Sequence, residues 1–318
     1  MKPLPISRRE FVGSTLAAAS ATTALLGAAR PTASHAASRR LHLSTNSYSW
    51  QVFYQREGKD FGAALDTGLA DVRASEIEGY EPGLGTLDDL RRLEPALKTQ
   101  GLEMRSLYVG SILHDPDELE KSLGQAIAVA REAREKLGTR IVVTNPNPIQ
   151  WGGAQSKSDA QLRAQAQALN RLGRELKSFG VTLAYHNHDI ELRHAAREFH
   201  HMLAGTDPDC VKFCLDAHWV YRGSGNSQVA LFDVIRLYGS RIVELHLRQS
   251  QNGVWSETLG PGDIDYPALA EAVLKTGARP HLVLEIAVED GTPRTLSPRE
   301  AHLKSAAYAR EVFAALPG

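Results

Sequence analysis

The sequence predicts a single-domain α/β protein that folds as a (β/α)8 TIM barrel. From Leu41 onward, short apolar runs rich in β-branched residues alternate with longer amphipathic segments, a pattern typical of strand–helix units on a parallel sheet. Eight such runs occur within residues 37–318, which matches the repeat number and length of a closed barrel. An open doubly wound sheet is the alternative, but no glycine-rich phosphate-binding fingerprint follows the first run.

The eight expected strands are the apolar runs, and they lie at Leu41–Ser44, Asp71–Ser75, Glu103–Tyr108, Arg140–Thr144, Val181–His186, Val211–Asp216, Ile242–Leu247 and His281–Ile286. Apolar residues spaced by three and four predict helices between strands, for example at Asp117–Leu137, Ser158–Phe179, Gln228–Tyr238 and Tyr266–Thr276. Glycines between a helix and the next strand are expected to end helices in a left-handed conformation, at Gly101, Gly138, Gly180 and Gly277. Ser297 followed by Pro298 is expected to open the last helix.

The N-terminal residues differ in composition from the rest of the chain. Ser7-Arg8-Arg9-Glu10-Phe11 precedes an apolar run of small residues at 14–29, and Ser34-His35-Ala36 offers small side chains for cleavage. Residues 1–36 therefore resemble a twin-arginine export signal, which places the mature domain, residues 37–318, in the periplasm or outside the cell. This run is shorter than the ~20 residues that a bilayer crossing requires, and no longer one follows, so no membrane span is expected in the mature protein.

Charge and cysteine content exclude two classes of protein. The formal net charge is -1, which provides no excess of basic residues for a nucleic-acid backbone. The two cysteines, Cys210 and Cys214, lie four residues apart, and if their segment is extended as a strand they are too far apart for a disulfide. We therefore expect two buried free thiols rather than a disulfide-stapled or cysteine-ligated fold.

Potential metal ligands follow each of the last four expected strands. They are His186, His188 and Glu191 after the fifth strand, Asp216 and His218 after the sixth, His246 at the seventh and Glu285 at the eighth. Because catalytic groups of such barrels lie at the C-terminal strand ends, these side chains should converge. Asp216 and Glu285 both end apolar runs, where an unpaired carboxylate is costly. A divalent cation bound by both would remove that cost, and mixed carboxylate and imidazole ligands suit Mn²⁺, Mg²⁺, Zn²⁺ or Co²⁺.

The same segments resemble the sugar phosphate isomerase/epimerase family, also described as xylose isomerase-like barrels. The segments "YHNHDIEL" at 185–192, "LDAHWV" at 215–220 and "LGPGDIDYPAL" at 259–269 are similar to motifs of that family. The resemblance implies a metal held by Asp216, His246 and Glu285 together with one ligand from the fifth strand. At that position the family commonly has a glutamate and this chain has His186, so the fourth ligand is either His186 or Glu191. Glu191 is the preferred choice because a carboxylate neutralises the cation better.

The chemistry implied by this site is proton transfer next to a carbonyl. A bound divalent ion lowers the barrier to removing that proton, and His186 and His188 are the candidate general bases. Residues expected to contact the sugar are Trp219, His218, Arg248, Asn46, Tyr48 and Trp50. Arg73 lies near the end of the expected second strand, where family members often have an acidic residue, and Glu76 is the nearby substitute.

The predicted activity is therefore that of an exported, metal-dependent isomerase or epimerase acting on a sugar or keto-sugar. No basic cluster or glycine-rich cradle requires a phosphate group on the substrate. A lyase or dehydratase acting on 3-keto-glycosides is an alternative of the same class, and a non-catalytic periplasmic carbohydrate-binding protein is an alternative of a different class. The sequence is compatible with an oligomer.

Overall fold

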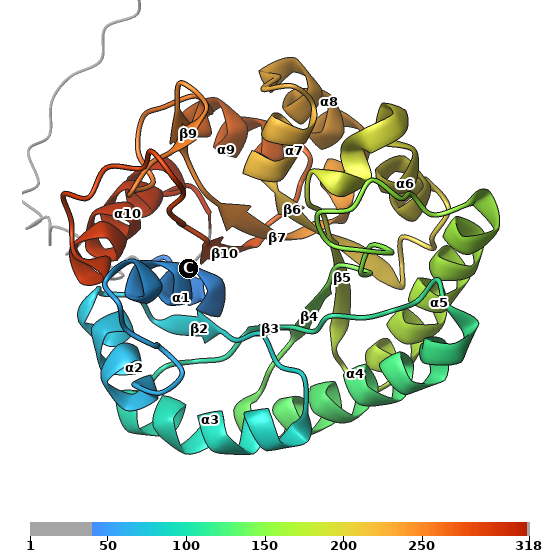
Figure 1. The fold of residues 1–318 in the computed structure, drawn as a ribbon, viewed down its shortest axis with the longest axis horizontal. Coiled ribbons are helices and arrows are strands. Elements are labelled where there is room, and N and C mark those ends of the chain that lie inside the picture. The colour runs from blue at the N-terminus through green and yellow to red at the C-terminus, as the bar shows by residue number, and fades with distance from the viewer. Residues whose placement is uncertain (1–39, 317–318) are drawn as a thin grey trace, which may run out of the picture. The chain divides into compact units, whose positions relative to one another are not determined.

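The computed structural model describes residues 40–316, which form a nearly closed barrel of parallel strands (Figure 1). Its eight strands are β1 (Leu43–Asn46), β2 (Gly79–Glu81), β3 (Ser106–Tyr108), β4 (Ile141–Thr144), β5 (Thr182–His186), β6 (Val211–Asp216), β7 (Ile242–Leu247) and β10 (His281–Leu284). Adjacent strands pair in the order β2-β1-β10-β7-β6-β5-β4-β3, and isolated bridges between Gly79 and Glu103 and between Gly83 and Tyr108 join β2 to β3. The predicted (β/α)8 fold is confirmed.

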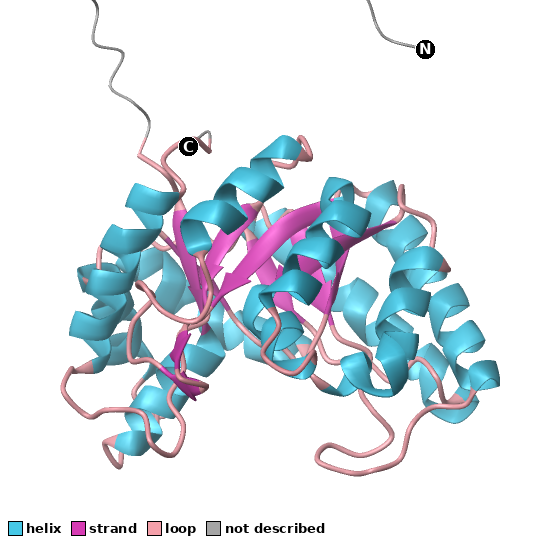
Figure 2. Ribbon diagram, turned by 90° about the horizontal axis from the view of Figure 1, so that it is seen from above, coloured by secondary structure: helices cyan, strands magenta, loops and turns pink. Residues whose placement is uncertain are grey.

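The helices pack along the outside of these strands (Figure 2). They are α1 (Ser47–Arg56), α2 (Leu65–Ala74), α3 (Leu87–Gln100), α4 (Pro116–Leu137), α5 (Asp159–Ser178), α6 (Arg193–Ala204), α7 (Ala217–Gly223), α8 (Gln228–Tyr238), α9 (Tyr266–Lys275) and α10 (Pro298–Val312). Two 3-10 turns, η1 (Ile190–Leu192) and η2 (Gly239–Arg241), precede α6 and β7, and a small hairpin of β8 (Ser250–Gln251) and β9 (Val254–Trp255) follows β7.

Local sequence signals account for most helix boundaries. Capping boxes open three helices, with Thr86 starting α3, Ser158 starting α5 and Ser297 starting α10. The four glycines expected near helix ends all have left-handed backbone angles, with φ of 62°, 71°, 78° and 84° at Gly101, Gly138, Gly180 and Gly277. The helices predicted around residues 117–137, 158–179, 228–238 and 266–276 are confirmed to within a residue at each end.

The prediction of the second strand was wrong. Residues 71–75 form the end of α2 and its C-cap, because Leu69 and Val72 are three residues apart and both bury their side chains on one helix face. The true strand, β2, is only three residues long and lacks an apolar run. Arg73 therefore lies on a helix, and Glu76 forms an exposed ion pair with Arg40. The acidic residue at the end of strand two is Glu81.

Side chains alternate in direction along each strand, so every second residue points into the barrel interior. Val143, Ala184 and Cys214 form a small buried cluster that is separate from the main core between strands and helices. His186 follows Ala184 by two residues and Asp216 follows Cys214 by two, so both point into the same interior, nearer the C-terminal mouth. Within residues 40–316, Cys210 and Cys214 are both buried free thiols, as predicted.

None of the helices in residues 40–316 is long and apolar enough to cross a membrane. The predicted export signal, residues 1–36, lies outside the described residues.

Candidate active site

Four side chains from four neighbouring strands converge at the C-terminal mouth of the barrel. His186, Asp216, His246 and Glu285 each offer a ligand atom, and these atoms all lie within 4.8 Å of one another. His186 and Asp216 end β5 and β6, Asp216 pairs in register with His246 on β7, and Glu285 directly follows β10. We call these four residues the ligand group. The sequence-based prediction that acidic and imidazole groups meet here agrees with this geometry.

The ligand group is buried and incompletely hydrogen-bonded. Among the described residues, neither ring nitrogen of His186 has a hydrogen-bond partner, nor does Oδ2 of Asp216. Buried polar atoms are normally paired, and an unpaired buried carboxylate oxygen carries a large desolvation cost. Two imidazoles and two carboxylates at this spacing are donors that divalent ions such as Mg²⁺, Mn²⁺, Zn²⁺ or Co²⁺ accept. The donor set therefore fits a divalent cation.

Neighbouring side chains orient the members of the ligand group. Asn46 Nδ2 donates to Glu285 Oε2 at 2.6 Å, and Arg248 donates to the other carboxylate oxygen of Glu285. Nε2 of His246 lies 3.1 Å from Oε1 of Glu81, while its Nδ1 faces Glu285 Oε2 at 2.5 Å. Carboxylates that contact the second ring nitrogen of a metal-binding histidine commonly fix its tautomer and orientation. Glu244, whose Oε1 is hydrogen-bonded to His246 Nε2 at 3.3 Å, and the adjacent Glu81 are both in the position to do this for His246.

Burial and neighbouring charges have opposite effects on the two carboxylates of the ligand group. Burial, reinforced by the charge of Glu285, raises the pKa of Asp216 to about 7. Burial also acts to raise the pKa of Glu285, but Arg248 and His246 outweigh it and hold that pKa below its ordinary value. Glu285 is therefore ionised at neutral pH, whereas Asp216 is partly protonated until a positive charge is placed beside it.

Glu191 lies outside the ligand group. Its Oε1 accepts a hydrogen bond from Asn145 Nδ2 at 3.0 Å, and its Oε2 accepts one from the backbone N–H of His188 at 2.7 Å. The same Asn145 nitrogen donates to the carbonyl of His186 at 3.1 Å. Glu191 lies within η1, after β5, and connects this turn to Asn145 at the end of β4. Of the two strand-five alternatives, the geometry therefore places His186, and not Glu191, with the other three ligands.

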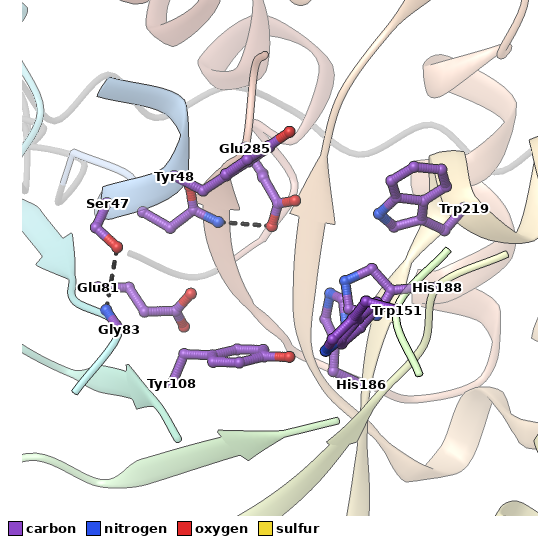
Figure 3. Close-up of a pocket in the computed structure, with 11 residues that line it drawn as sticks. Ser47, Tyr48, Glu81, Gly83, Tyr108, Trp151, His186, His188, Trp219 and Glu285 are labelled. Atoms are coloured by element: carbon purple, nitrogen blue, oxygen red, sulfur yellow. Dashed lines mark hydrogen bonds between the residues drawn. The ribbon is translucent and has the colours of Figure 1, made fainter. Parts of the chain in front are cut away.

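A cavity of about 400 Å³ opens over the ligand group. Its inner wall is formed by Glu81, Tyr108, His186, His188 and Glu285, which point toward one space in Figure 3. Three aromatic side chains form its rim, namely Tyr48 from α1, Trp219 from α7 and Trp151 from the loop between β4 and α5. The centroid of the His188 ring lies 4.8 Å from that of His186, 5.2 Å from that of Trp151 and 5.8 Å from that of Trp219. His188 therefore contacts both His186 of the ligand group and two of the three rim side chains.

The predicted sugar contacts divide into two sets. Asn46, Tyr48 and Trp219 line the cavity. His218 and Arg248 are buried behind it, where Arg248 contacts Glu285 and its guanidinium lies 4.2 Å from the ring centroid of Trp255. Arg248 thus acts on the site through Glu285.

Trp50 is a core residue rather than a cavity residue. Its side chain is fully buried, its indole N–H donates to Thr45 Oγ1 at 3.2 Å, and its ring stacks on His302 at 4.0 Å. Tyr48 and Trp50 were both expected to contact the sugar, but both lie on α1, which begins at Ser47. Residues two apart on a helix point to different sides, so Tyr48 reaches the cavity and Trp50 points into the core.

Several cavity residues were missed by the sequence analysis. They are Ser47, Glu81, Gly83, Tyr108 and Trp151. Glu81 and Gly83 would have been found if β2 had been located correctly, and Tyr108 was assigned to its strand without a role. Trp151 lies in the long loop between β4 and α5, where no hydrophobic period exists to indicate which side chains turn inward.

Comparison with known proteins agrees with this architecture. Residues 69–312 match the family of xylose isomerase-like TIM barrels. The chain belongs to this family. It is 22% identical over 274 residues to an inosose dehydratase of Clostridium perfringens, an alignment that covers 76% of this chain and 88% of that protein.

Two solved structures share the fold at low sequence identity. A xylose isomerase-like TIM barrel protein from Mycobacterium smegmatis in complex with magnesium has a TM-score of 0.65 at 15% identity, covering 87% of this chain and 97% of that one. A 3-keto-D-glucoside 4-epimerase from E. coli has a TM-score of 0.62 at 15% identity, covering 86% of this chain and 100% of that one.

Proposed function

We propose that the protein is a divalent-metal-dependent enzyme that removes the proton next to the carbonyl group of a keto-sugar or cyclic keto-polyol. The observation that carries this proposal is the convergence of four buried, incompletely paired ligand atoms at the mouth of the barrel. His186, Asp216, His246 and Glu285 would hold the cation, and when bound it would draw electron density from the substrate carbonyl and acidify the adjacent C–H bond.

His188 is the proposed general base. Burial lowers its pKa to about 4, so its imidazole is neutral at neutral pH and able to accept a proton. Its ring lines the cavity next to the ligand group, and the hydrogen bond from its backbone N–H to Glu191 fixes the turn that carries it. Return of the proton to the opposite face of the same carbon gives an epimer. Return to the neighbouring carbon gives an isomer.

A dehydratase or lyase is the second candidate, and Tyr108 is the observation that favours it. This tyrosine lines the same cavity, and burial raises the pKa of its phenol, so the hydroxyl stays protonated. A neutral phenol beside the substrate could donate a proton to a departing hydroxyl or alkoxide after the first proton has been removed. The likeness to an inosose dehydratase over three quarters of the chain supports this second step.

Proton exchange in D2O tests the shared first step. Purified protein, metal-free or loaded with Mg²⁺, Mn²⁺, Zn²⁺ or Co²⁺, is incubated with a panel of ketoses, 3-keto-glucose and an inosose, and the C–H signals beside the carbonyl are followed by proton NMR. We expect metal-dependent loss of one such signal in the wild type and its persistence in His188→Ala. His200→Ala, which removes a histidine on α6 outside the cavity, is the matched control.

The outcomes separate the candidate functions. Epimerisation or isomerisation gives a product of unchanged mass, whereas dehydration gives a product lighter by one water. Tight binding of a keto-sugar with no exchange under any metal would refute the enzymatic proposal and favour a carbohydrate-binding protein.

We also propose export by the twin-arginine pathway, supported by the Arg8-Arg9 pair and the apolar run that follows it. The protein should be recovered from the periplasm of a producing cell, and replacing both arginines by lysine should retain it in the cytoplasm. Unchanged location of the doubly substituted protein would contradict this proposal.

A further inference from the structure

Exposed apolar side chains gather at the cavity mouth. Six large hydrophobic side chains are exposed in residues 40–316, and three of them are Tyr48, Ile149 and Trp151. Tyr48 and Trp151 line the rim, and Ile149 lies on the same loop as Trp151. The side chain of Trp151 is 53% exposed. Leaving a large apolar ring in water at the edge of a cavity is unfavourable, and such groups commonly mark a ligand-binding surface.

The loop that carries Trp151 is anchored to α6 by several contacts. Lys157, which is 2% exposed, donates to Glu198 Oε1 at 2.6 Å and to the carbonyl of Pro146 at 3.2 Å. Arg193 donates to the carbonyl of Gly153 at 2.8 Å, and Arg197 donates to the carbonyl of Lys157 at 2.5 Å. The loop is thus anchored after Trp151 at two points, Gly153 and Lys157. A contact surface that is already fixed loses less conformational entropy when a ligand binds.

The layering of the cavity indicates which part of a ligand would meet Trp151. A reacting ring placed over the ligand group contacts His188, and the exposed ring of Trp151 packs edge-on against the same His188 at the rim of the cavity. Trp151 therefore faces whatever substituent extends from that ring toward solvent.

The cationic side chains near Trp151, Lys157 on its loop and Arg193 on α6, indicate the chemistry of that substituent. Lys157 is engaged with Glu198, and the Arg193 guanidinium is engaged with a backbone carbonyl, so both cations already have partners. A phosphate group on the substrate would therefore contact the Trp151 ring and not an uncommitted cationic side chain. A neutral ring with an apolar face, such as a second pyranose, matches an exposed indole better.

We propose that Trp151 forms a second subsite, which binds the glycosidic sugar of a keto-glycoside while the keto ring lies over the ligand group. This inference rests on the proposed function and specifies its substrate class as a keto-glycoside rather than a free or phosphorylated keto-monosaccharide.

A comparison of two matched ligands tests the subsite. The affinity of the metal-loaded protein for a keto-disaccharide and for the corresponding keto-monosaccharide is measured by titration calorimetry. The wild type should bind the keto-disaccharide about five- to tenfold more tightly, the gain expected of one ring stacked on an aromatic side chain. Trp151→Ala should remove that preference by lowering affinity for the keto-disaccharide by a larger factor than affinity for the keto-monosaccharide, whereas Trp151→Phe should retain part of the preference. Val229→Ala, which removes another exposed apolar side chain on α8, is the control.

Equal affinity of the wild type for the two ligands, or an equal loss of both affinities in Trp151→Ala, would overturn the proposal. The exchange assay in D2O is run with both ligands on the same variants, and Trp151→Ala should raise the KM for the keto-disaccharide by a larger factor than the KM for the keto-monosaccharide. If no variant exchanges protons, the proposed catalysis fails, and the calorimetric comparison still decides whether the subsite exists.

Discussion

The identity of the strand-five ligand gives the sharpest prediction. His186→Ala should lower affinity for a divalent cation by more than about 100-fold, because even residues that only support metal ligands commonly cost 10- to 100-fold when they are removed. Glu191→Ala should keep the affinity for the cation within about tenfold of the wild type, since its carboxylate contacts Asn145 and the His188 backbone rather than the ligand group.

The cost of Glu191→Ala should appear instead in stability. The substitution removes the acceptor of the His188 backbone N–H and one of the two acceptors of the Asn145 amide, which keeps its bond to the His186 carbonyl. At about 1–3 kcal/mol for each lost hydrogen bond, we expect a loss of roughly 2–6 kcal/mol. For a domain of this size that corresponds to a fall in Tm of roughly 3–10 °C.

Metal affinity is measured by competition with a chromophoric chelator, and Tm by circular dichroism on the same preparations. Glu257→Ala is the matched control, because Glu257 is another buried carboxylate, bound by Arg56 and Thr295 outside the cavity. A Glu191→Ala protein that is folded and has lost its metal, or a His186→Ala protein that binds the metal as the wild type does, would refute this assignment of ligands.

Three further predictions concern stability and binding. A divalent metal at 100 times its Kd should stabilise the wild type by about 2.7 kcal/mol, measured in thermal melts. EDTA should reverse this stabilisation, and Glu285→Ala should abolish it. An unchanged Tm of the wild type on addition of metal would contradict the metal site. Trp50→Ala should lower the free energy of unfolding by about 3–5 kcal/mol, because a buried, stacked ring is lost, whereas Tyr48→Ala should weaken keto-sugar binding with little change in Tm. Burial lowers the pKa of His302 from 6.5 to about 3, so the folded protein keeps this imidazole neutral at pH values where the unfolded chain protonates it. The free energy of unfolding is therefore unaffected by His302 above pH 6.5 and falls as the pH is lowered toward 3. At pH 5 the loss is about 2 kcal/mol. His302→Gln should therefore lose less stability than the wild type between pH 7 and pH 5 in urea titrations, and equal losses would count against this origin.

The sequence was most informative where a structural feature depends on residues close together in the chain. Helix α8 was predicted with its observed boundaries from apolar spacing alone, and α4, α5 and α9 to within one residue at each end. Asp216, His246 and Glu285 could be placed at one mouth because each ends an apolar strand and parallel strands of a barrel end on the same side. Strand β2 was missed because its three residues carry no run of β-branched side chains.

The sequence by itself determined the repeating strand–helix plan and the types of ligand at the last four strand ends, since both follow from local patterns of burial. Only the tertiary structure decided that His186 joins the ligand group while Glu191 supports its turn, and that Trp151 rather than Trp50 faces the cavity. The physical reason is that these choices depend on helix rotation, strand register and contacts across long stretches of chain, such as Asn46 with Glu285. Hydrophobic periodicity says which residues are buried, but it does not say which buried side chains meet.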